Sequence, residues 1–284
     1  MPDFPIVDSH LHIWDPDNLN YPWLSGVSKL NRAFLPDDYR QECGVVDVDT
    51  MVFIECDAHP DEARPEVDWV NAQATIDPRI KAIVAFAPLD LGDAVRAHLE
   101  RLADVNRVRG IRRIYQDETD TEFCLRPKFV EGVRALSEYG LSFDICIKHP
   151  HLESSIELVR KCPDTSFVLD HIGKPDIRQQ LFEPWRAQMF ELAKLDNVVC
   201  KLSGVATEAD HENWTSEQLH PFIDTAFEAF GSERVMFGGD WPVALSAIHF
   251  PRWIEIVDTE LAGLSETEAR NVFRDTALRF YRII

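Results

Sequence analysis

Asp8-Ser-His-Leu-His12 continues the first apolar run of the chain, Pro5–Asp8, and decides between two folds. In an open doubly wound sheet, this position carries the Gly-rich turn that binds a dinucleotide. Here it carries two histidines and no glycine. The stretch therefore favours the other arrangement of parallel strands and helical connections, a closed (β/α)8 barrel.

Seven further apolar runs rich in β-branched residues follow the first. Amphipathic segments of helical periodicity lie between the runs, as crossovers between parallel strands require. The sequence therefore predicts an α/β fold, a single TIM-like barrel. The further strands are expected at Thr50–Glu55, Ile80–Phe86, Val108–Ile114, Leu141–Ile147, Ser166–Asp170, Asn197–Leu202 and Arg234–Gly238, and helices at Asp93–Asp104, Pro127–Tyr139, Leu152–Lys161, Glu183–Leu195, Ser216–Phe230 and Ser265–Tyr281.

Length and composition agree with a barrel. The chain has 284 residues, of which 45% are hydrophobic, and this length is close to the roughly 250 residues typical of a closed α/β barrel. Two domains of about 140 residues each would also fit the length. No low-complexity tract or Gly/Ser linker interrupts the chain, so we expect a single domain over residues 1–284.

Charge and cysteine usage limit the class of protein. The net charge of −20, from 49 acidic and 29 basic side chains, disfavours nucleic-acid and anionic membrane partners. The first ten residues lack the basic and apolar regions of a signal peptide, and no apolar run approaches the roughly 20 residues that span a bilayer. The cysteines form no CxxC pair, and Cys56, Cys146 and Cys200 lie inside apolar runs. We therefore expect a cytoplasmic protein. The sequence leaves open whether the chain forms a homo-oligomer.

Polar side chains gather at the carboxyl ends of the predicted strands, where barrel enzymes assemble their active sites from separate loops. Polar residues scattered over a surface would not select one end of the strands so consistently. The residues at these ends are His10, His12, Glu55, Arg112, Arg113, Lys148, His149, His171, Lys201 and Asp240.

His10 and His12 are two residues apart, so on a strand both side chains point to the same face. Two convergent imidazoles suit a single divalent metal or a pair of hydrogen-bond donors. Two unrelated polar residues in a turn are the alternative. The position at the end of the first predicted strand favours a functional pair.

Asp240 and His171 end the last and the sixth predicted strands. A carboxylate opposite two histidines suits a metal ligand or a general base for water, whereas a helix N-cap is the alternative for Asp240. A hydrogen-bonded core histidine is the alternative for His171.

Arg112 and Arg113 are adjacent, so only one of them is expected to face the barrel interior, where it could bind a carboxylate or oxyanion. A salt bridge at the barrel rim is the alternative, and Lys148 has the same two interpretations. Among the aromatic residues, Trp241 is the best candidate for a pocket wall beside a sugar ring, and Trp23 is either a second wall residue or an anchor of the first loop.

Four motifs in order carry a resemblance: Asp8-Ser-His-Leu-His12, Leu169-Asp-His-Ile-Gly-Lys174, Cys200-Lys-Leu-Ser-Gly204 and Phe237-Gly-Gly-Asp-Trp-Pro242. Over residues 6–282 the chain resembles the amidohydrolase superfamily of the amidohydrolase-2 type. Within it, the chain looks like the branch with L-fuconolactonase, L-rhamnonolactonase and pyrone-dicarboxylate lactonase.

The resemblance implies that His10, His12, His171 and Asp240 surround the scissile carbonyl group. Asp240 would be the general base, and the histidines would polarise the carbonyl. It further implies one divalent metal, zinc, on His10, His12 and Asp240, with His149 as a further candidate ligand and a metal-free site as the alternative. Arg112, by the same resemblance, is the arginine that faces the substrate.

The expected function is hydrolysis of a small cyclic ester, a sugar lactone such as L-fucono- or L-rhamnonolactone, in carbohydrate metabolism. A metal-dependent decarboxylase or another amidohydrolase-2 hydrolase is the alternative enzyme. A non-catalytic binding protein is disfavoured, because the full set of three histidines and one aspartate is present.

Overall fold

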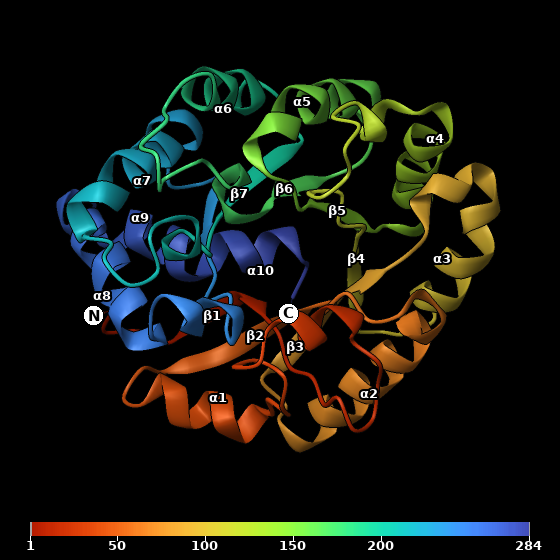
Figure 1. Cartoon of the computed structure of the whole chain (residues 1–284), viewed down its shortest axis with the longest axis horizontal. Helices are drawn as coiled ribbons and strands as arrows, with labels where there is room; N and C mark the ends of the chain where they lie inside the picture. Colours follow the sequence, from red (N-terminus) through yellow and green to blue (C-terminus); the bar gives the residue numbers. More distant parts are fainter. Residues whose placement is uncertain (1, 284) are drawn as a thin grey trace.

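The computed structural model describes residues 2–283 and contains an eight-stranded parallel sheet in which the strands follow their order in the sequence (Figure 1). This is the predicted TIM-like barrel. Most strands end earlier than the apolar runs do, because the chain turns into loops at their carboxyl ends. The strands are β1 (Ile6–Leu11), β2 (Val48–Ile54), β3 (Ile80–Phe86), β4 (Val108–Arg112), β5 (Ser142–Ile145), β6 (Phe167–Leu169), β7 (Val198–Leu202) and β8 (Val235–Phe237).

The segment that follows β8 pairs with the end of β1. Leu11 and Trp241 form an isolated parallel bridge. The Asp240 amide donates to the His10 carbonyl oxygen at 2.8 Å, and the His12 amide donates to the Trp241 carbonyl oxygen at 2.8 Å. These bonds close the sheet on itself. They also place the motif Asp8–His12 beside the motif Phe237–Pro242.

Helices surround the sheet (Figure 1). They are α1 (Pro36–Cys43), α2 (Ala63–Ile76), α3 (Arg96–Ala103), α4 (Pro127–Ala135), α5 (Leu152–Lys161), α6 (Trp185–Ala193), α7 (Ser216–Phe230), α8 (Phe250–Glu260), α9 (Glu266–Arg270) and α10 (Thr276–Phe280). The predicted bounds of α5 and α7 are confirmed, whereas α1, α2 and α8 were not predicted. Within residues 2–283, no helix has the length and apolar content needed to cross a bilayer.

Helix α7 illustrates why these segments are helical. Thr215 and Gln218 form a capping box at its start, and Gly231 ends it at a φ of 68°, which favours glycine. Its buried residues recur at the spacing of one helical face, which packs toward the barrel. They are Leu219, Phe222, Ile223, Thr225, Ala226 and Phe230.

The C-terminal segment covers the amino ends of the strands. Arg279 donates to the carbonyl oxygen of Glu233, just before β8, and Arg282 donates to that of Gly140, before β5. In Figure 1, α10 accordingly crosses the centre of the ring of helices. Ala277 and Tyr281 pack on Val7 and other barrel residues, so this segment closes the amino end of the barrel.

A β-bulge interrupts the pairing of β1 with β2. Asp8 pairs with Met51, but the next pair joins Leu11 to Phe53, so β1 advances three residues where β2 advances two. One extra residue in a strand exchanges the two faces for all residues beyond it.

The bulge determines where the two candidate histidines point. Val7 packs in the barrel interior, so regular alternation would also turn Ser9 and Leu11 inward. After the bulge, Leu11 instead belongs to the core between barrel and helices, while His10 and His12 meet inside the barrel mouth. The extra residue thus delivers both imidazoles to the same side.

Candidate active site

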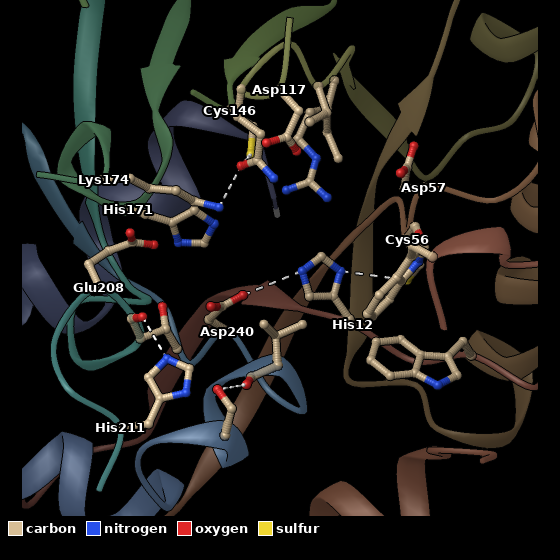
Figure 2. A pocket seen from close by; sticks show the side chains of 18 residues that line it. His12, Cys56, Asp57, Asp117, Cys146, His171, Lys174, Glu208, His211 and Asp240 are labelled. Atoms are coloured by element: carbon tan, nitrogen blue, oxygen red, sulfur yellow. Dashed lines mark hydrogen bonds and ion pairs between the residues drawn. The ribbon is translucent and has the colours of Figure 1, made fainter. Parts of the chain in front are cut away.

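A cavity of about 360 Å³ opens at the carboxyl ends of the strands. His12, His171 and Asp240 line it, together with Trp23 (Figure 2). His10 is fully buried just beneath it. The volume falls within the range of small-molecule sites, roughly 300–1,000 Å³. Four predicted catalytic residues therefore converge at one cavity.

His10, His12 and Asp240 form a compact triangle of potential ligand atoms. His10 Nε2 and His12 Nε2 are 3.2 Å apart, and Asp240 Oδ1 lies 3.7 Å from the first and 3.5 Å from the second. His12 Nδ1 lies 2.9 Å from the carbonyl oxygen of Ile54, to which only a protonated nitrogen can donate. That bond fixes the tautomer in which His12 Nε2 carries the free lone pair.

These three residues fit a divalent metal. Tetrahedral zinc with bonds of about 2.0–2.1 Å holds its ligand atoms about 3.3–3.4 Å apart, close to the three observed separations. Two imidazoles and one carboxylate are ligands that zinc accepts. Among residues 2–283, neither group of side chains with metal-ligand spacing includes a cysteine. His10, His12 and Asp240 could therefore hold the one divalent ion that the resemblance implies.

Asp170 stands behind His10. Its Oδ1 lies 3.5 Å from His10 Nδ1 and 2.9 Å from Lys201 Nζ, and its Oδ2 lies 3.3 Å from Arg112 Nη1. Lys201 also pairs with Asp144 at 3.0 Å. A carboxylate behind a ligating imidazole fixes its orientation and increases its basicity. Asp170 also belongs to a second group with metal-ligand spacing, but two cations already engage it.

Asp170 was not among the predicted site residues, although it directly precedes His171 in the motif Leu169–Lys174. The signal was present as a carboxylate at the end of an apolar strand. Its function depends on the tertiary contacts with His10 and Lys201, which no local pattern reveals.

The loops that carry His171 and Asp240 have unusual backbones. His171, Ile172, Lys174 and Asp240 have φ values of 55°, 49°, 45° and 55°, in the left-handed region. This region is costly for residues other than glycine, above all for β-branched Ile172. Such strain persists where the surrounding structure enforces it, and it clusters at functional sites.

Electrostatics leave one anionic and two neutral groups at the centre of the site. Burial lowers the pKa of His10 and of His171 well below the usual value, so both rings are neutral at pH 7. Burial alone would raise the pKa of Asp240, but the neighbouring His171 and His12 more than offset this effect and lower it. Asp240 is therefore ionised, as a base or a metal ligand must be.

Gly204 lies against the two catalytic candidates at a φ of +57°. A Cβ atom here would lie 2.6 Å from His171 Nδ1 and 2.8 Å from Asp240 Oδ2. Gly204→Ala should therefore displace both side chains and lower kcat more than about tenfold, since misplacement by about 1 Å can cost 100-fold. Steady-state kinetics with a substrate of the enzyme measures this effect.

Gly140→Ala is the matched control, because Gly140 has a φ of +64° and no atom within 4 Å of its virtual Cβ. Both variants should lose about 1–2 kcal/mol of stability from the left-handed backbone, but Gly140→Ala should keep its kcat. Equal kcat values in the two variants would contradict the contact of Gly204 with the site.

The two neighbouring arginines face opposite ways, as strand alternation predicts. Arg112 is buried, with Nε 2.7 Å from Glu55 Oε1 and Nη1 3.4 Å from His10 Nε2. Arg113 lies outside and pairs with Glu118 at 2.9 Å. Arg112 lines the cavity, but its guanidinium group is largely engaged by protein carboxylates. Both interpretations of Arg112 thus retain a structural basis.

Two predicted site residues, Lys148 and His149, lie away from the cavity. Strand β5 ends at Ile145, two residues earlier than expected, so the chain turns before Lys148 and His149. Lys148 is half exposed and pairs with Asp117, and His149 belongs to neither group with metal-ligand spacing. This placement does not support substrate binding by Lys148 or metal binding by His149.

Trp241 also points away from the cavity. Its indole instead packs against Tyr39 and Phe34. Of the two tryptophans predicted as wall residues, Trp23 lines the cavity and Trp241 does not. The indole nitrogen of Trp23 donates to the Cys56 carbonyl oxygen at 2.8 Å, so this residue both anchors its loop and lines the cavity.

Comparison with known proteins identifies similar chains. The family described as amidohydrolase matches residues 7–283. L-fucono-1,5-lactonase of Burkholderia multivorans is 30% identical over 291 residues, covering 98% of this chain and 96% of the relative. L-rhamnono-gamma-lactonase of Scheffersomyces stipitis is 24% identical, and the match covers 100% of this chain and 100% of the relative.

A solved structure is similar over nearly its whole length. The crystal structure of an amidohydrolase from Burkholderia multivorans with bound Zn gives a TM-score of 0.89 at 30% identity, covering 99% of this chain and 100% of that one. The relative thus combines the same fold with zinc, and His10, His12 and Asp240 offer this chain a donor set for such an ion.

Proposed function

This chain belongs to the amidohydrolase family, and on that premise we propose that it hydrolyses a small cyclic ester, a sugar lactone. One observation carries the proposal: Asp240 and two imidazoles converge at the cavity, with Asp240 Oδ1 3.5 Å from His12 Nε2. The lactonase names of two relatives support the choice of substrate.

His10, His12 and Asp240 would hold a divalent metal, which when bound supplies a Lewis acid for the lactone carbonyl. Behind them, Asp170 orients His10, and the carbonyl oxygen of Ile54 orients His12. The chain therefore fixes its ligand atoms before any substrate enters.

Asp240 has a second task in this mechanism. Its Oδ1 faces the two imidazoles, which leaves Oδ2 to accept a proton from the attacking water. The water oxygen bonds to the carbonyl carbon, and the ring C–O bond then breaks. The proton held by Asp240 passes to the leaving ring oxygen, so that the product is a hydroxy acid.

His171 lies close enough to assist. Its Nδ1 is 2.9 Å from the Ser203 hydroxyl, which fixes the ring, and the residue lines the cavity beside Asp240 (Figure 2). A neutral imidazole N–H can donate a hydrogen bond to the oxyanion that develops on the carbonyl oxygen. Trp23 provides apolar surface for the face of a sugar ring.

The test is a pH-indicator assay over a panel of aldonolactones, with and without a chelator, together with elemental analysis. We expect acid release from at least one aldonolactone and one equivalent of zinc per chain. Chelation should lower kcat at least about tenfold, since a Lewis acid contributes several kcal/mol to the transition state.

Other outcomes separate the alternatives. Full activity without metal would favour a site in which the histidines act alone. Carbon dioxide release from an aromatic acid, with no lactone hydrolysed, would replace the proposal by a decarboxylase.

A further inference from the structure

Three basic side chains lie around the site, the buried Arg112 and Lys201 and the half-buried Lys174, and they differ in how their charges are neutralised. Arg112 pairs with Glu55 and Asp170, and Lys201 pairs with Asp144 and Asp170. Desolvating a cation is expensive, and these carboxylates compensate for it. Lys174, which lines the cavity, does not follow this pattern.

Lys174 keeps hydrogen-bonding capacity toward the cavity. Its Nζ donates to the amide oxygen of Gln116 at 2.7 Å, and within residues 2–283 no carboxylate forms an ion pair with it. An ammonium group has three N–H donors, so two are left for a ligand. Burial alone would lower the pKa of Lys174, but the nearby Cys146, Glu208 and Asp240 raise it, so the group is charged at pH 7.

Glu208 is the acidic counterpart on the same side of the cavity. It lies at the end of a short helix after β7, Ala206–Glu208, and its carboxylate lines the cavity. For the part of the chain that the structure covers, neither a hydrogen bond nor an ion pair satisfies this carboxylate. Figure 2 shows Lys174, His171 and Glu208 on one side, opposite His12 and Cys56.

We propose that Lys174 and Glu208 form a subsite that binds adjacent hydroxyl groups of the substrate and sets the specificity of the enzyme. The inference rests on the proposed lactonase function. The ammonium group donates to one hydroxyl oxygen, and the carboxylate accepts the proton of the neighbouring hydroxyl. The two side chains attract each other without forming an ion pair, so a ligand with both donors and acceptors satisfies them together.

The surrounding charges favour neutral hydroxyls over a substrate carboxylate. Glu208, Asp57 and Asp117 all line the cavity, and Asp240 lies at its centre. Lys174 is the one cavity-lining cation, within residues 2–283, that no carboxylate pairs. A carboxylate on the substrate would therefore be repelled by the carboxylates of the cavity, whereas a hydroxyl group adds no charge.

The test compares kcat/KM for a hydroxylated aldonolactone and an unsubstituted lactone of the same ring size. Lys174→Met should lower the value for the hydroxylated substrate about 10- to 100-fold, the usual cost of a hydrogen bond to a charged group. The value for the unsubstituted lactone should change less than about threefold. Glu208→Gln should give the same pattern with a smaller loss, because the amide keeps an acceptor oxygen.

Lys194→Met and Glu191→Gln are matched controls, because these residues pair with each other on the exposed surface of the α6 end, and both variants should keep wild-type values. Should Lys174→Met fail to fold, Lys174→Gln removes the same charge and serves in its place. Equal losses for both substrates, or a lower melting temperature with unchanged selectivity, would indicate a merely structural role and overturn the subsite.

A binding experiment separates this inference from the proposed function. Calorimetry with a hydroxylated lactam, which resists hydrolysis, should show weaker binding to Lys174→Met than to the wild type, with little difference for an unsubstituted lactam. If the wild type hydrolyses no lactone, the proposed function fails, and the calorimetric difference still tests the subsite. Preference of the wild type for a carboxylated lactone would overturn it.

Discussion

Asp240→Asn should lower kcat on a good lactone substrate by about 10²–10⁴-fold, the usual contribution of a general base. The variant keeps the shape of the side chain but removes the charge that faces His10 and His12. The protein should stay folded, because the residue lies at the barrel mouth, where side chains serve the site more than the core. Steady-state kinetics and a melting curve of the same preparation measure both effects.

The competing interpretation treats Asp240 as a helix cap. Loss of a cap costs about 1 kcal/mol and would lower the melting temperature by a few degrees with little effect on kcat. Asp120→Asn is the control, since Asp120 pairs with Arg126 on the exposed surface and should leave kcat unchanged. A normal kcat in Asp240→Asn would remove this residue from the mechanism.

Lys201→Met should have the largest effect on stability. Lys201 is fully buried between Asp144 and Asp170, and both carboxylates lose their shared cation in this variant. Breaking a buried ion pair by removing one partner costs about 3–5 kcal/mol. Urea unfolding of the variant and the wild type measures the difference, and Lys194→Met, on the exposed surface, should change stability little.

The loss in Lys201→Met should depend on pH. Burial raises the pKa of Asp144 to about 6 even though Lys201 lowers it, so removal of the lysine raises this pKa further. A raised folded-state pKa means that the folded protein binds more protons than the unfolded chain, so stability falls as pH rises. The loss of unfolding free energy in the variant, relative to the wild type, should therefore be larger at about pH 8 than at about pH 5. A deficit independent of pH would show that the cost is one of packing.

Much of the fold was predictable because it depends on local periodicity. Apolar runs separated by amphipathic segments identified the eight strands, and the bounds of α5 and α7 were predicted correctly. The helices α1, α2 and α8 were missed. In α1, whose mean hydropathy is low, just three residues are buried, so the core-facing pattern is too sparse to read.

Part of the candidate site was predictable for a similar reason. Residues at the carboxyl ends of parallel strands must meet at one mouth of the barrel, so His10, His12, His171 and Asp240 could be grouped from the sequence. The rule fails where a strand ends early. Lys148 and His149 follow β5 after its last residue, Ile145, and therefore leave the barrel axis.

The sequence by itself determined the barrel, the end that carries the site and the residue types available for chemistry there, because periodicity and order along the chain are local properties. Only the tertiary structure decided which side chains enter the cavity. The β1 bulge turns His10 and His12 inward, and behind His10, Asp170 from the turn after β6 meets Lys201 from β7. Such contacts join residues far apart in the chain. A shift of one residue in register moves every following side chain of the strand to the opposite face of the sheet.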